Sequence, residues 1–167
     1  MSRESAAGRA PRGRSKRDLI AEVISLARMH QAANDAFDEV AYTKLGINRT
    51  DGRCLDIIEN NGPITAGRLA QLSGLTTAAV TSVLDRLERA GYARRVRDAG
   101  DRRQVIVELT PLMAERGARI WGPLSKDAFA EMGRLSTEQL ELVAEWFRRG
   151  RTLNERHIER VGDLDFG

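Results

Sequence analysis

The sequence predicts a mainly α-helical protein with a small β-hairpin wing: a winged helix-turn-helix lobe with long dimerisation helices at its N- and C-terminal ends. Three observations support this fold class. Two short helical patterns separated by a glycine turn occupy residues 65–90, two alternating strand patterns follow over 92–109, and long helical periodicities precede and follow them. The 167 residues, 41% of them hydrophobic and 31% charged, suffice for one globular domain with extensions.

Residues 1–17 are expected to form a disordered basic tail. They hold six basic residues and one acidic residue with almost no large apolar side chain, so they cannot bury enough surface to fold. A solvated tail and a basic arm that adds non-specific affinity for phosphates are the two interpretations. The net charge of +3 arises in this tail, and the remaining chain carries local basic patches on a nearly neutral background.

A long first helix is expected within residues 18–48. Apolar residues recur every three or four positions from Asp18, and Leu45-Gly46 provides a C-terminal cap. A helix of this length needs an equally long partner surface, and a second copy of the chain is the simplest one. His30 lies on its apolar stripe. We interpret it as a core or interface histidine, with ligand binding or pH sensing as the alternative.

Residues 49–110 are expected to form the winged helix-turn-helix lobe. Its first helix should start at Thr50-Asp51 and end before Pro63. Helices over Thr65–Ser73 and Thr77–Ala90 then have the spacing of a helix-turn-helix. In the second of them an apolar stripe faces the core, and the opposite face carries the small side chains that close approach to a DNA groove requires.

The hairpin of this lobe carries the strongest functional signal. Strands are expected over Tyr92–Arg97 and Gln104–Leu109, with a turn at 98–101 between them. Arginines on such a turn favour the negative potential of a narrow minor groove, whereas a solvated charged loop is the alternative interpretation. Asp101 is expected to hold Arg103 extended through a bidentate ion pair.

Residues 111–162 are expected to form the C-terminal dimerisation helices, followed by a short tail over 163–167. One helix should start at Pro111 and be kinked or interrupted at Gly122-Pro123, and another should start at Ser136 with a capping box. Two apolar stripes on the last helix imply two packing partners. One stripe comprises Leu140, Val143 and Phe147, and the other comprises Leu142, Trp146 and Leu153.

The sequence lacks the groups that catalysis needs. No cluster of His, Cys and carboxylates has metal-ligand spacing, no glycine-rich phosphate loop follows a strand, and no base is paired with a Ser or Thr, so we expect no enzyme, metal or cofactor. No apolar window is long enough for a membrane span, and no membrane partner is expected. The single cysteine, Cys54, fits a reducing cytosol; it is interpreted as a small buried hydrophobe, with a redox-sensing thiol as the alternative.

The chain resembles the MarR family of transcriptional regulators. The resemblance rests on the stretches LAQLSGLTTAAVTSVLDRLERAGYARR and RVRDAGDRRQVIVELTP and on the long helices at both ends, and it covers about residues 18–160. It implies a cytoplasmic, bacterial homodimer that joins the nucleoid when bound. It also implies a recognition helix in the major groove of a palindromic operator, a wing arginine in the minor groove, repression as the usual mode, and release by a small, often aromatic effector.

Combining the residue patterns with the resemblance gives a set of expected DNA contacts on the recognition helix and the wing. They are Thr76, Thr77, Ala78, Thr81, Ser82, Arg86, Arg95, Arg97, Asp101, Arg102 and Arg103. The expected partners are double-stranded DNA, a second copy of the chain and a small-molecule effector whose site is unknown. The alternative is a protein-interaction module that uses a winged-helix dimer as a scaffold without binding DNA.

Overall fold

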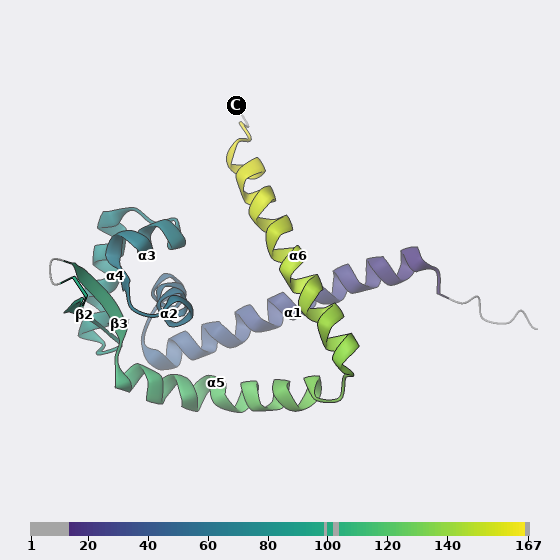
Figure 1. Cartoon of the computed structure of the whole chain (residues 1–167), viewed down its shortest axis with the longest axis horizontal. Coiled ribbons are helices and arrows are strands. Elements are labelled where there is room, and N and C mark those ends of the chain that lie inside the picture. Colours follow the sequence, from purple (N-terminus) through teal and green to yellow (C-terminus); the bar gives the residue numbers. More distant parts are fainter. Residues whose placement is uncertain (1–13, 99, 102–103, 166–167) are drawn as a thin grey trace, which may run out of the picture. The chain divides into compact units, whose positions relative to one another are not determined.

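The computed structural model describes residues 14–98, 100–101 and 104–165, and it confirms the predicted fold class. The chain divides into two compact units, Met1–Pro111 and Leu112–Gly167. The first unit contains α1 (Lys16–Leu45), α2 (Arg49–Asn61), β1 (Ile64–Thr65), α3 (Ala66–Ser73), α4 (Thr77–Arg89), β2 (Ala93–Arg97) and β3 (Val105–Leu109) (Figure 1). The other two helices are α5 (Pro111–Met132) and α6 (Thr137–Gly162).

Polar caps fix where the first two helices begin. Ser15 accepts a hydrogen bond from the backbone N–H of Asp18 at 3.2 Å while the Asp18 carboxylate accepts from Ser15, which completes a capping box. The helix therefore begins at Lys16, two residues before the expected start and inside the predicted tail. Asn48 caps α2 in the same way through Asp51, two residues ahead of the start expected at Thr50.

The helix-turn-helix is confirmed, and a threonine caps the start of each of its two helices. Thr65 accepts from the backbone N–H of Arg68 at 3.1 Å and Thr76 from that of Ala79 at 3.2 Å. Gly74 ends α3 with a φ of 71°, a left-handed conformation that glycine adopts without strain. The turn between α3 and α4 therefore follows directly from Thr65, Gly74 and Thr76.

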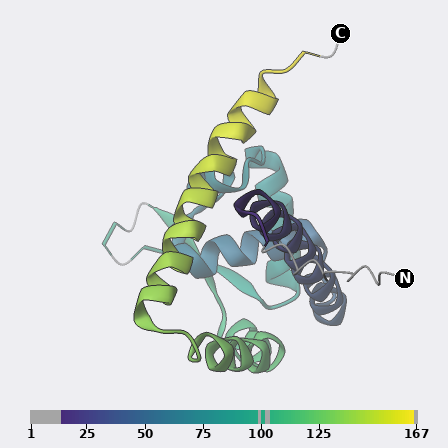
Figure 2. The same cartoon turned by 90° about the vertical axis from the view of Figure 1, so that its right-hand side faces the viewer.

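The sheet has three antiparallel strands in the order β1-β3-β2. β2 pairs with β3 in the expected hairpin, with Arg95 opposite Val107 and Arg94 opposite Glu108. The two-residue strand β1, which pairs Ile64 with Val107, was not predicted, because two residues are too few to show an alternating pattern. Figures 1 and 2 show the hairpin projecting from the helices of the lobe.

The hydrophobic core lies within the lobe. Its fully buried apolar side chains come from α2, α3, α4 and the sheet, and they include Ile58, Leu69, Val80, Val83, Leu84, Leu87, Tyr92 and Val107. The end of α1 joins this core through Tyr42, whose ring leaves no room for a Cβ on Gly52. The buried Tyr92 hydroxyl donates to the Leu45 carbonyl at 2.8 Å and thereby holds the C-terminal end of α1 on the lobe.

The second unit has little core of its own. α5 continues through Gly122-Pro123 without the expected interruption, and α6 begins with the expected Ser136–Gln139 capping box. No residue of α6 is buried. The stripe of Leu142, Trp146 and Leu153 is exposed, with Leu142 at 72%, whereas Leu140 and Val143 of the other stripe are half-buried. In the part of the chain that the structure describes, no helix is long and apolar enough to span a membrane.

Candidate nucleic-acid interface

The exposed face of α4 consists of small side chains. Val80, Val83, Leu84 and Leu87 bury one side of the helix, and Thr76, Thr77, Ala78, Thr81 and Ser82 are exposed on the other. Thr81 Oγ1 donates to the Thr77 carbonyl at 3.0 Å, and Ser82 Oγ donates to the Ala78 carbonyl at 3.2 Å. Because the hydroxyl protons are used within the helix, the oxygens of Thr81 and Ser82 present mainly acceptor lone pairs. They suit the amino donors of base edges better than phosphate oxygens.

Arg86, expected to contact a phosphate, points toward the interior of the lobe. Its guanidinium forms a bidentate ion pair with the Asp51 carboxylate, at 2.5 Å from Nη2 and 3.1 Å from Nε. The Asp51 side chain is only 3% exposed, and its hydrogen bond raises the pKa of Arg86. Because Asp51 also closes the α2 capping box, this pair ties α4 to the start of α2.

Arg95 likewise turns toward α4 and away from the solvent-exposed side of the wing. Its guanidinium pairs with Asp85 Oδ1 at 2.9 Å and with the Glu88 carboxylate, and its backbone N–H donates to Glu88 Oε1 at 2.8 Å. The neighbouring Arg94 pairs across the strands with Glu108, with Nε and Oε1 2.7 Å apart. Arg94 and Arg95 thus both pair with carboxylates of the protein itself.

Of the remaining predicted contacts, Arg97 and Asp101 lie within the described part of the wing. Arg97 is exposed at the end of β2. The Asp98 carboxylate accepts from the backbone N–H groups of Gly100 and Asp101 at 2.7 and 2.8 Å, which shapes the turn. Arg102 and Arg103 lie outside the described residues, and so does the pairing expected between Asp101 and Arg103.

Cys54 and His30, for which sensing roles were left open, lie in different surroundings. Cys54 is fully buried, as predicted, and desolvation followed by the nearby Asp51 charge raises the pKa of its thiol. A raised pKa disfavours the thiolate, so the surroundings do not activate this thiol. His30 does not lie in the core of the single chain, because its side chain is exposed, with Nε2 3.3 Å from Asn34 Nδ2, and the interface role expected as the other possibility stays a prediction. Among the described residues no group of His, Cys, Asp or Glu could hold a metal ion.

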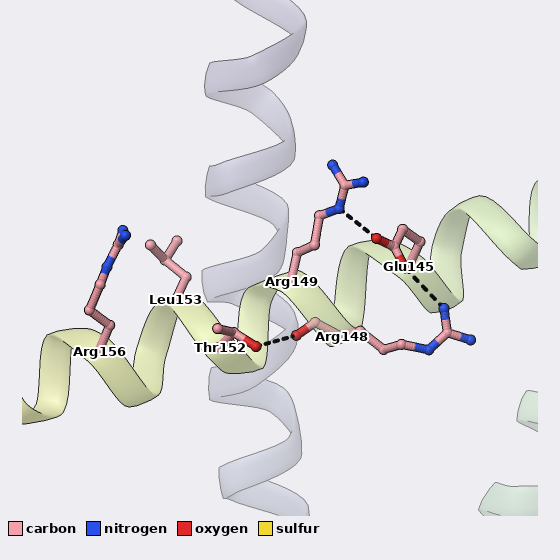
Figure 3. Close-up of a pocket in the computed structure, with 6 residues that line it drawn as sticks. All are labelled: Glu145, Arg148, Arg149, Thr152, Leu153 and Arg156. Carbon is pink, nitrogen blue, oxygen red and sulfur yellow. Dashed lines mark hydrogen bonds and ion pairs between the residues drawn. The ribbon is translucent and has the colours of Figure 1, made fainter.

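A hollow of about 430 Å³ on α6 is lined by arginines (Figure 3). Arg148 Nη1 and Arg149 Nε both pair with Glu145, at 3.1 and 2.6 Å, and these contacts lower the pKa of the glutamate. Leu153 and Arg156 complete the row, with Thr152 donating to the Arg148 carbonyl. One helix contributes the whole lining, so the hollow encloses no ligand by itself.

The inward pairing of Arg86 and Arg95 was not predicted, since Arg103 was the one arginine of the site to which an acidic partner, Asp101, was assigned. A usable signal was present for Arg95. In strand β2 it lies two residues after Ala93, which is buried, so alternation places both side chains on the inner face of the hairpin. Asp85 and Glu88, one turn apart on α4, are the acidic partners on the facing helix.

Comparison with known proteins gives one consistent result. The MarR family model matches residues 47–105. The chain is 33% identical over 149 residues to the uncharacterized HTH-type transcriptional regulator YcgE of Bacillus subtilis, covering 88% of this chain and 96% of that protein. It is 33% identical over 101 residues to the multiple antibiotic resistance protein MarR of Salmonella typhimurium, covering 59% and 70%. A mutant of S. aureus MepR bound to oligodeoxyribonucleotide has a similar fold, with a TM-score of 0.53 at 21% identity, covering 78% of this chain and 97% of that one.

Proposed function

Because the chain belongs to the MarR family, and is therefore a DNA-binding transcriptional regulator and not an enzyme, we propose that it binds a palindromic operator as a homodimer. The observation that carries this proposal is the exposed, small-residue face of α4 beside the arginine-bearing wing. A helix with such a face can approach base edges closely. The MepR structure with bound oligodeoxyribonucleotide supports the same use of the shared fold.

In this proposal α4 enters the major groove, and Thr77, Thr81 and Ser82 meet base edges or adjoining phosphates. Arg97 and Arg102 supply charge at the backbone, and Arg103 enters the neighbouring minor groove, where the negative potential is enhanced. Arg86 supports α4 through Asp51, so we no longer assign it a phosphate contact. Two lobes would read two half-sites separated by about one turn of DNA, roughly 34 Å.

The dimer proposal is supported by apolar surface that the single chain leaves open. Large hydrophobic side chains are exposed on α1, α5 and α6, including Met29, Phe129, Leu142, Phe147 and Ile158, each at least 60% exposed. Soluble proteins rarely leave so many such side chains uncovered. A second copy of the chain would cover them and would set the spacing of the two lobes.

Repression and release by a small effector complete the proposal. An effector that binds better to one spacing of the two lobes would shift the dimer toward that spacing and change its operator affinity. Family membership supports this mode of control. A ligand screen that follows thermal unfolding would identify the effector, because a ligand that binds the folded dimer raises its unfolding temperature.

The proposal is tested by selecting duplexes from a random library with the full-length protein and titrating the selected duplex with salt. We expect a palindromic consensus and an affinity that falls steeply as salt rises, because bound phosphates release counterions. Replacing Arg103 by Ala should cost about 1–3 kcal/mol of operator affinity in a variant that remains folded and dimeric. Failure to enrich any duplex would instead favour the protein-interaction module.

A further inference from the structure

We propose that Arg95 is a positioning residue that fixes the wing to the recognition helix and does not itself contact DNA. The inference rests on the proposed function, since it concerns how α4 and the wing act together on one duplex. It replaces the direct DNA contact that the sequence analysis expected for Arg95. Ion pairs, burial and the register of the hairpin support it independently.

The contacts of Arg95 span two residues of α4 at once. Nη2 lies 2.9 Å from Asp85 Oδ1 and Nη1 pairs with Glu88 Oε2, so the planar guanidinium bridges two carboxylates one helical turn apart. The backbone N–H of Arg95 donates to the other Glu88 oxygen at 2.8 Å. Glu88 therefore binds both the backbone and the side chain of Arg95, which fixes β2 along α4.

Burial separates Arg95 from the other arginines of the strand. Its side chain is 30% exposed, against 59% for Arg94 on the opposite face. Ala93, two residues earlier on the face of Arg95, is 2% exposed and lies in the core. The direction of the Arg95 side chain is thus set by the strand, and a rotation toward a phosphate would break both ion pairs.

The pairing also fixes the angle between the wing and α4, because Arg95 on β2 holds Asp85 and Glu88 on the helix. Because the wing must reach the minor groove while α4 lies in the major groove, the angle between β2 and α4 decides whether both contacts form on the same sequence. Arg95 therefore contributes to discrimination between sequences.

The experiment compares Arg95→Gln with Arg97→Gln, an exposed arginine two residues further along the same strand. The full-length variants are titrated with salt against the duplex selected by the parent protein and an unrelated duplex of equal length. For Arg95→Gln we expect about tenfold weaker binding to the selected duplex, little change on the unrelated one, and an unchanged slope of log K against log salt. Loss of a phosphate contact would instead weaken both duplexes and reduce the slope by about 0.9, the pattern expected for Arg97→Gln.

A second set of variants tests the pairing itself. In an Asp85→Asn/Glu88→Gln background, Arg95→Gln should have much less effect than in the parent, because its partners are already gone. Arg95→Lys keeps the charge but cannot bridge two carboxylates, so it should not restore discrimination. If Arg95→Gln does not fold, Glu88→Gln alone tests the positioning role. A positioning role predicts that Glu88→Gln discriminates less between the selected and the unrelated duplex. Removal of a repelling charge would instead make the variant bind both duplexes more tightly, with discrimination intact.

The assignment is overturned if Arg95→Gln lowers the salt slope, or if its effect is the same with and without the two acidic residues. These results would leave the proposed function standing, because the parent would still select and bind its duplex. If the parent selects no duplex at all, the proposed function fails and the assignment of Arg95 fails with it.

Discussion

The winged lobe and the long helices of this chain differ in how they are stabilised. The lobe buries apolar side chains from three helices and the sheet, and among the described residues its buried acid, Asp51, is paired. By contrast, Met113 is the one buried residue of α5, and α6 has none. On α1, burial is confined to Ala41, Tyr42 and Leu45 at the end that joins the lobe.

This difference separates two physical tasks. The lobe has its own core and holds α4 through packing and ion pairs, as the DNA-reading role proposed for this helix requires. The long helices have amphipathic sequences without enough partners inside one chain, so their stability must come from surface outside it. We infer that the lobe is stabilised locally and the long helices by association. The following variants test that distinction.

The largest effect is expected from Arg86→Ala in the lobe. The change leaves the Asp51 carboxylate buried without its guanidinium partner, and breaking such a pair is strongly destabilising. We expect about 3 kcal/mol less free energy of unfolding, measured by urea denaturation with the dimer held well above its dissociation constant. DNA binding at low temperature should persist in the fraction that remains folded.

Arg89→Ala is the matched control, because Arg89 is exposed on the next turn of α4 and donates to the Asp85 carbonyl. Its effect should stay within about 0.5 kcal/mol. An equal, small loss for both variants would mean that the Asp51–Arg86 pair does not stabilise the lobe. A change in operator salt slope for folded Arg86→Ala would restore the phosphate contact first expected for Arg86.

An effect that is smaller per copy of the chain, this time on association, is expected from Leu142→Asp. The side chain is 72% exposed in the single chain, and burying a leucine against a second copy contributes about 2 kcal/mol. Because the dimer loses this burial in both copies, its dissociation constant, measured by sedimentation equilibrium, should rise roughly a thousandfold.

Thr152→Asp serves as the control for this prediction, since it introduces the same charge on the arginine-lined face of α6. It should leave the dissociation constant unchanged or lower it slightly. A parent protein that sediments as a monomer, or equal weakening by both variants, would contradict the assignment of the apolar stripes to the dimer.

The same contrast explains what the sequence could predict. Helix ends in the lobe follow from local chemistry at Thr65, Gly74 and Thr76, and the predicted bounds agree with the structure to within one residue. Cys54 and the apolar stripe of α4 were correctly placed inside because their burial follows from periodicity. The two-residue strand β1 was missed because its partner strand lies 40 residues later, beyond any local pattern.

The candidate site was harder to predict than the fold, since an arginine looks the same in sequence whether it meets DNA or a carboxylate. Arg86 and Asp51 lie 35 residues apart, and only the folded lobe brings them together. Arg95 was predictable in part, because strand alternation places it on the face of Ala93. The identity of its partners required the packing of β2 on α4.

The smallest effect is expected at the junction of the two regions, where α1 meets α2. Loss of hydration and the nearby Asp38 carboxylate raise the pKa of Asp56, which also accepts a hydrogen bond from Tyr42 at 3.4 Å. A carboxyl whose pKa is raised by folding stabilises the protein while protonated, and this contribution is lost as the pH rises through the folded pKa. At neutral pH the ionised Asp56 therefore opposes the docking of α1 on the lobe.

Asp56→Asn removes that charge and should stabilise the protein at neutral pH by less than about 1 kcal/mol, as for other partly solvated charges. The gain should shrink as the pH falls through the raised pKa of folded Asp56 and should vanish below the ordinary aspartate pKa of 3.8, because the parent residue is then protonated in the folded and unfolded states alike. Urea denaturation at neutral and acid pH measures both values, and Glu141→Gln on α6 controls for general loss of negative charge. A gain that is independent of pH would mean that shape or hydrogen bonding, and not charge, limits the packing of α1 against the lobe.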